Sequence, residues 1–259
     1  MSQNFKCGRI LGLLAALSAA TLLTGCVTTS DELGKKDDAA AAQANMQLGI
    51  NAMQQNNLSE AKTKIDKALS QDPKSADVHF VAAILYARIK EYSKADDLYS
   101  RAIDLDPRNS DYVNGYAVFL CSRKNYEKGE KLALKAAENP LYKSPHVALL
   151  NAGVCALDSG HAGKAEEYFR RAIKLQPEFS PALLYLAELE LKSGNFLSAR
   201  AFLERYQQYG PAIPKSLLLG VRIERGMGNA NAAQNYARRL NTEFPTSEET
   251  KALTDVERK

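Results

Sequence analysis

Tryptophan is absent from this chain, histidine occurs only three times, and neither sign of charge prevails: 34 Lys and Arg stand against 30 Asp and Glu. Proteins that bind nucleic acid need a clustered basic face, and a net charge of +4 does not indicate one. His79, His146 and His161 lack the spacing to Cys or carboxylates that a metal site needs. There is no Gly-rich phosphate loop and no nucleophile elbow. We therefore expect no enzyme, no metal or other cofactor, and no nucleic-acid partner.

The start of the chain combines basic and apolar residues in the manner of a secretory signal. Lys6 and Arg9 precede an apolar run at 10–23, which is shorter than the roughly 20 residues of a membrane-spanning helix. Gly25-Cys26 then completes the sequence Leu-Thr-Gly-Cys, which resembles the bacterial lipobox. The pattern predicts a signal peptide at 1–25 and lipidation of Cys26. The alternative is a plain signal anchor with an incidental cysteine.

The lipobox resemblance also implies a location. Acyl chains on Cys26 would anchor the protein stably, because more than one chain inserts into the bilayer. The next residue is Val27 and not Asp, which implies delivery to the outer membrane. Residues 26–41 are polar and charged, and their first half has no helical or strand period, so we expect a lipidated N-terminus followed by a flexible tether.

Proline marks a regular period in the rest of the chain. Pro73 and Pro107 are 34 residues apart, and Pro177, Pro211 and Pro245 follow one another at the same spacing. The interval of 70 residues between the two groups fits one repeat of 34 and one of 36. Thirty-four residues is the period of the tetratricopeptide repeat (TPR), a pair of packed helices.

Small residues recur where the two helices of such a hairpin approach closely. When the proline is counted as position 32, position 20 is Ala or Gly in six repeats: Ala61, Ala95, Gly129, Ala165, Ala199 and Ala233. A larger side chain there would overpack the hairpin at a cost of about 1–3 kcal/mol. Position 27 is Ala in the first four repeats, whereas Tyr206 and Leu240 in the last two predict a different packing distance.

The predicted fold is therefore all-α, an α-solenoid of six tandem TPR helical hairpins that forms a right-handed superhelix with a concave groove. The repeats are predicted at 42–75, 76–109, 110–145, 146–179, 180–213 and 214–245. The polar segment 246–259 is predicted to be a C-terminal cap.

The groove is the predicted site for a protein partner. The first helices of stacked hairpins line the concave face, and their inward positions are unusually apolar in repeats 1 to 4. The predicted contacts are Met46, Ile50, Met53, Phe80 and Ile84, which suit an extended or helical apolar segment of a partner. The alternative is that the next repeat or the N-terminal segment covers these side chains.

Two further cysteines stand in the first helices of repeats 3 and 4. Cys121 is at position 12 and Cys155 at position 10, and adjacent first helices pack side by side. A secreted protein meets an oxidising compartment, so we predict a Cys121–Cys155 disulfide. The alternative is a pair of small buried apolar side chains.

Three stretches go beyond what the TPR pattern requires. They are VNGYAVFLC at 113–121, AENPLY at 137–142 and KSLLLGVR at 215–222. These stretches resemble those of the type IV pilus biogenesis lipoproteins of the PilF/PilW pilotin family, and the resemblance covers nearly the whole mature chain. One departure is Asn114-Gly115-Tyr116, where the family pattern suggests a second Asn before the Tyr.

The resemblance implies a scaffold, anchored in the outer membrane by its lipid, whose TPR body lies in the periplasm. Its implied partner is the secretin of the type IV pilus system, whose outer-membrane localisation and multimerisation it would promote as a monomer. Two alternatives stay open at this point. One is a TPR lipoprotein of another envelope assembly, such as outer-membrane protein assembly or polysaccharide export. The other is an activator of a peptidoglycan enzyme.

Overall fold

The structure, a computed structural model, describes residues 29–257. Within this range the chain forms thirteen helices and no strand. The helices are α1 (Thr29–Gln54), α2 (Leu58–Gln71), α3 (Ala76–Arg88), α4 (Tyr92–Leu105), α5 (Ser110–Ser122), α6 (Tyr126–Ala137), α7 (Pro145–Asp158), α8 (Ala162–Leu175), α9 (Ser180–Lys192), α10 (Phe196–Tyr209), α11 (Pro214–Gly226), α12 (Ala230–Glu243) and α13 (Glu248–Glu257). No described helix is both long and apolar enough to cross a membrane.

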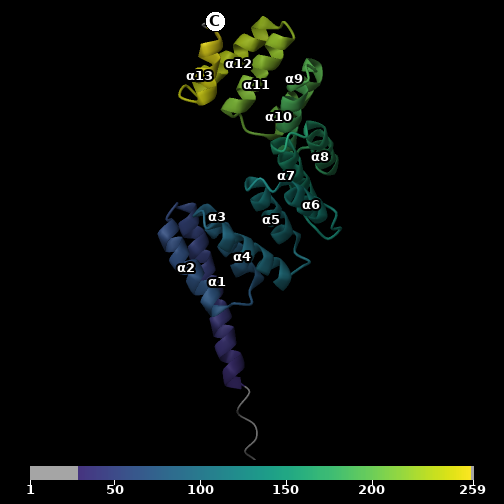
Figure 1. Ribbon diagram of the computed structural model, residues 1–259. Coiled ribbons are helices and arrows are strands. Elements are labelled where there is room, and N and C mark those ends of the chain that lie inside the picture. The colour runs from purple at the N-terminus through teal and green to yellow at the C-terminus, as the bar shows by residue number, and fades with distance from the viewer. Residues whose placement is uncertain (1–28, 258–259) are drawn as a thin grey trace, which may run out of the picture.

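The helices pair into six hairpins that stack into an elongated, curved array (Figure 1). We call the odd-numbered helices α1 to α11 the A helices and the even-numbered helices α2 to α12 the B helices. Each A helix packs against the B helix that follows it, and A helices of neighbouring hairpins also touch in the pairs α1–α3, α5–α7 and α9–α11. The fold is thus a TPR solenoid, as the 34-residue period predicts.

The turn between the A and B helix has the same backbone conformation in every hairpin. Position 15 has positive φ throughout, with values from 59° to 85°, at Asn56, Lys90, Lys124, Gly160, Gly194 and Gly228. Glycine adopts this left-handed region without steric cost, whereas lysine pays a small penalty there. The last three hairpins therefore use the residue that the turn favours.

Helix α1 begins earlier than the sequence pattern predicts. It starts at Thr29, so most of the predicted flexible tether at 26–41 is helical, and this part of the prediction does not agree with the structure. Ala39 to Ala42 are strong helix formers, and no proline interrupts the segment. Extending an existing helix avoids the cost of nucleation, so the packed half of α1 supports the rest. In Figure 1 the start of α1 projects beyond α2.

The chain after the sixth hairpin also has more structure than a polar cap requires. Helix α13 packs against α11 and α12, and Leu253 is buried with Leu217 and Leu240. The Thr250 hydroxyl donates to the Phe244 carbonyl at 2.7 Å. The exposed end of the last repeat is therefore closed by apolar contact as well as by polar residues.

Candidate functional site

The A helices present an apolar stripe at one repeated position. Position 9 holds Ile50, Ile84, Val118 and Val154 in the first four repeats. Ile84 is 39% exposed and Val118 is 46% exposed, and the other two are half-buried. Large apolar side chains that stay open on successive helices are typical of a surface that binds another protein. We call these four residues the apolar stripe.

The five predicted contact residues do not all lie on this open surface. Met46 is 6% exposed and Met53 is 8% exposed, because each belongs to a core cluster formed with the following hairpin. The expectation that these two methionines contact a partner therefore needs correction. Ile50 is half-buried, and Ile84 is the most open of the five.

Phe80 packs against aromatic rings of the two helices that follow α3. Its ring centroid lies 5.8 Å from that of Tyr99 and 5.0 Å from that of Tyr112. The ring also occupies the space that a Cβ atom at Gly115 would need. This contact gives a steric reason for the glycine at 115, which departs from the family pattern, and it places Phe80 between helices α3, α4 and α5.

Polar bridges join neighbouring A helices beside the stripe. The Tyr112 hydroxyl donates to Asp77 Oδ1 at 2.6 Å, and the Asn151 amide donates to Asn114 Oδ1 at 3.0 Å. Burial, together with the carboxylate of Asp77, raises the pKa of Tyr112. These pairs are 35 and 37 residues apart, so only the stacking of hairpins reveals them. Only Asn114 gives a signal in the sequence, because it is a polar residue at position 5, where Met46 and Leu184 are buried.

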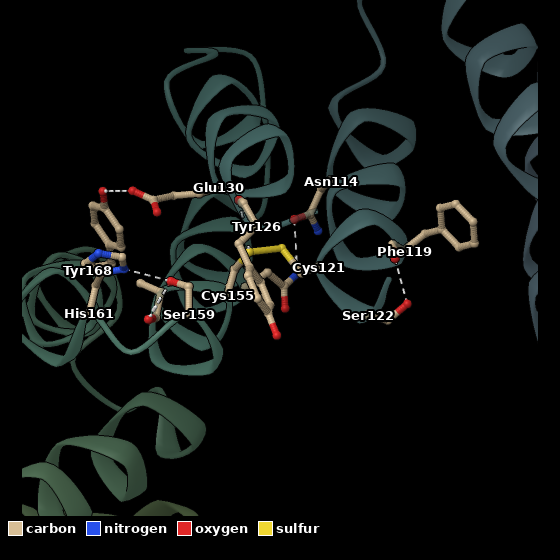
Figure 2. The surroundings of a disulfide bond; sticks show 12 residues. Asn114, Phe119, Cys121, Ser122, Tyr126, Glu130, Cys155, Ser159, His161 and Tyr168 are labelled. Atoms are coloured by element: carbon tan, nitrogen blue, oxygen red, sulfur yellow. Dashed lines mark hydrogen bonds between the residues drawn. A yellow bond between two sulfur atoms is a disulfide. The ribbon is translucent and has the colours of Figure 1, made fainter. Parts of the chain in front are cut away.

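The structure places Cys121 of α5 and Cys155 of α7 together in a disulfide (Figure 2). Their Cα atoms are 5.5 Å apart, and Cys155 is fully buried. The Tyr126 carbonyl oxygen lies 3.4 Å from the Cys155 sulfur. Cys121 Sγ also fills the space beside Gly129, where a Cβ atom would collide with it. The disulfide thus joins the A helices of two neighbouring hairpins.

The histidines take structural positions. His79 Nδ1 lies 2.9 Å from the Ser75 carbonyl oxygen inside the first turn of α3. His146 packs edge-on against the ring of Phe179 at 4.7 Å, and burial lowers its pKa. His161 Nδ1 contacts Ser159 Oγ at 2.9 Å. The part of the chain that the structure describes contains no group of His, Cys, Asp or Glu that could hold a metal ion.

One predicted site residue lies outside the described residues. Cys26 and the signal peptide at 1–25 precede Thr29, the first residue of α1. The lipidation of Cys26 therefore stays a prediction.

Comparison with known proteins identifies the repeats and their relatives. Models of the tetratricopeptide repeat match residues 46–110 and 156–213. The type IV pilus assembly protein PilF of Pseudomonas aeruginosa is 33% identical over 156 residues, which cover 59% of this chain and 62% of the length of that protein.

Two solved structures resemble this fold over most of its length. A structure of Pseudomonas aeruginosa PilF is 30% identical, with a TM-score of 0.72, and the match covers 85% of this chain and 99% of that one. A structure of PilW, described as a widely conserved type IV pilus biogenesis factor, is 32% identical with a TM-score of 0.73. That match covers 82% of this chain and 98% of PilW.

Proposed function

The chain belongs to the PilF/PilW family of type IV pilus biogenesis TPR proteins, and from this premise we propose that it is the pilotin of a type IV pilus secretin. TPR modules of this family are protein-interaction scaffolds and not enzymes. In this role the TPR body binds a secretin subunit in the periplasm. The lipid on Cys26 directs the complex to the outer membrane, where the secretin forms its multimer.

The apolar stripe is the single observation that carries a binding role for the groove. Ile50, Ile84, Val118 and Val154 stand at the same position of four successive A helices, and Ile84 and Val118 remain 39% and 46% exposed. Burying such side chains against a partner contributes about 25 cal/mol for each Å² of apolar surface removed from water. An apolar segment of the secretin is the occupant that this surface suits.

The early start of α1 supports a short connection to the membrane. Thr29 follows Cys26 closely, and residues 29–41 rise about 1.5 Å each in a helix, or about 20 Å in total. The same residues fully extended would reach more than twice as far. In the proposed arrangement a helical spacer therefore holds the TPR body near the surface that the secretin enters.

The first experiment tests the pilotin role in cells. The gene is deleted and complemented with the wild type or with Cys26→Ala, and the heat-stable secretin multimer is followed by electrophoresis and membrane fractionation. We expect the multimer to be lost on deletion and the secretin to be mislocalised in the Cys26→Ala strain. Normal multimers in the deletion strain would reject the pilotin role.

The second experiment tests the stripe. The pair Ile84→Glu and Val118→Glu should abolish the secretin multimer, because two buried, unpaired charges would face the apolar segment of the partner. The matched control is Leu175→Glu with Leu197→Glu, since these side chains are 56% and 72% exposed on B helices. Circular dichroism and thermal unfolding check that both variants fold. Equal multimer levels in both variants would exclude the stripe as the contact.

A further inference from the structure

The concave face changes from apolar to charged at its C-terminal end. Between α9 and α11 lies a hollow of about 240 Å³, and four charged side chains line it: Glu188, Lys192, Lys215 and Arg222. Glu188 and Arg222 stand at position 9, the position that carries the apolar stripe in repeats 1 to 4. The groove therefore runs from an apolar half into a half with three cations and one carboxylate.

The single carboxylate in the hollow already has a partner. Lys215 Nζ lies 2.6 Å from Glu188 Oε1, and the Glu188 side chain is only 19% exposed. Lys192 and Arg222 are exposed, and neither forms an ion pair or a side-chain hydrogen bond with any residue that the structure describes. The hollow thus carries an excess of two positive charges.

Nearby acidic residues do not offset this excess. Glu190 and Glu224 are 7% and 5% exposed on the same two helices. Glu190 accepts from Arg170 at 2.6 Å and Glu224 accepts from Arg200 Nε at 2.7 Å, so both are held on the side facing the B helices. Each buried carboxylate is paired with a cation outside the hollow.

The floor of the hollow is apolar. Leu191, Leu218 and Leu219 line it beside the charged groups, and Leu218 is 9% exposed. A cation next to an apolar surface binds a carboxylate more strongly than one in open water, because the surface excludes solvent from the pair. The combination suits a carboxylate that is flanked by apolar side chains.

We propose that this hollow binds an aspartate or glutamate side chain of a partner protein, within a segment whose neighbouring apolar residues lie along the groove. The arginine fork of Arg222 and the ammonium of Lys192 would donate to the carboxylate. The proposal rests on the proposed protein-binding role and adds the chemistry that fixes the register and direction of the bound segment. Repeats 1 to 4 supply apolar contact, and repeats 5 and 6 supply charge recognition.

The test uses the folded mature chain and a defined probe. An acetylated, amidated hexapeptide, Leu-Ser-Leu-Glu-Leu-Ser, is titrated to millimolar concentration while the methyl signals of Leu191 and Leu218 are followed by NMR. We expect these signals to move, with binding about tenfold tighter than for the same peptide with Gln in place of Glu. Equal binding of both peptides would overturn the proposal.

Two further probes separate the sources of negative charge. The Gln peptide with a free C-terminal carboxylate and inorganic phosphate are titrated in the same way. If either one, but not the Glu peptide, moves the Leu191 and Leu218 signals, the hollow recognises a chain terminus or a phosphate, and a side-chain carboxylate is excluded.

Paired variants localise the effect. Lys192→Glu with Arg222→Glu should weaken binding of the Glu peptide about tenfold or more, and Lys192→Gln with Arg222→Gln should weaken it less. The control, Arg101→Glu with Lys131→Glu, makes the same change in net charge at exposed positions of α4 and α6. Equal weakening by the control would show a non-specific charge effect and reject the site. This titration contains no secretin, so its outcome is independent of the cellular test of the pilotin role.

Discussion

Tyrosine hydroxyl groups connect hairpins at several points of the solenoid. The Tyr86 hydroxyl donates to Asp66 Oδ1 at 2.5 Å, and Lys62 donates to the other oxygen of that carboxylate at 2.6 Å. Burial opposes the ionisation of Asp66, but the hydrogen bonds from Lys62 and Tyr86 outweigh it and lower the pKa of the carboxyl. Tyr168 donates to Glu130 at 2.7 Å in the same way, between hairpins 3 and 4 (Figure 2).

Tyr99 gives a direct test of how buried phenols affect stability. The residue is 5% exposed, and burial raises its pKa from 10.0 to about 12. The unfolded chain therefore loses this proton at lower pH than the folded protein does. The contribution of the protonated Tyr99 phenol to stability is therefore complete below pH 10.0 and is lost as the pH rises toward about 12.

The free energy of unfolding of the wild type should fall between these two pH values. This fall should be about 2 kcal/mol smaller in Tyr99→Phe than in the wild type. Urea unfolding at a series of alkaline pH values measures it. Tyr209→Phe is the control, because Tyr209 is 57% exposed. If Tyr99→Phe followed the same pH profile as the wild type, ionisation of Tyr99 would not contribute.

At the scale of single elements, helix α6 departs from the repeat for a steric reason. Position 20 is Ala in five repeats and Gly129 in the third. The structure shows why, since an added Cβ atom would collide with Cys121 Sγ and would lie only 3.0 Å from the Ala117 carbonyl oxygen and 3.2 Å from the Cys121 amide nitrogen. The cysteine at position 12 therefore takes the space that alanine fills elsewhere.

Gly129→Ala should destabilise the protein by about 1–3 kcal/mol, although helix propensity alone favours alanine by about 1 kcal/mol. Gly163→Ala in α8 is the matched control, because outside its chain neighbours and its own helix backbone no atom lies within 4 Å of the added Cβ, and it should be neutral or stabilising. Thermal and urea unfolding compare the two. A stabilised Gly129→Ala protein would show that the hairpin relaxes without cost.

At the scale of the whole molecule, stability in a solenoid comes from contacts within hairpins and between neighbours. The Cys121–Cys155 link joins hairpins 3 and 4, where the repeat is two residues longer than the others. Residues between α6 and α7 form that longer connection, and Leu141 within it is 83% exposed. A covalent bond thus bridges the junction at which the regular period is interrupted.

Replacing both cysteines by alanine should lower the free energy of unfolding by roughly 3–4 kcal/mol, because the bond closes a loop of 34 residues in the unfolded chain. Urea unfolding of the oxidised protein and of the variant measures this difference. Peptide mass mapping of the protein isolated from its native host without reductant tests whether the pair is oxidised. Free thiols in that sample, or equal stability with and without the cysteines, would contradict the prediction.

The sequence by itself determined the number and kind of hairpins. Prolines and small residues act within one hairpin, so their 34-residue spacing carries the architecture directly. Helices α3, α5, α9 and α11 begin at Ala76, Ser110, Ser180 and Pro214, the residues from which the second, third, fifth and sixth repeats are counted. The repeat pattern does not predict the early start of α1, because a helical segment outside the repeats depends on helix propensity and not on the repeat.

Only the tertiary structure decided which groove side chains remain open. Met53 and Phe80 each stand at a repeat position that is expected to face the groove. Packing of the next hairpin nevertheless covers the methionine and most of the phenylalanine. Lys192 and Arg222 acquire their common hollow only when α9 and α11 lie side by side. The physical reason is that exposure and unpaired charge depend on contacts between residues about one repeat apart or more, and local sequence spacing does not specify these contacts.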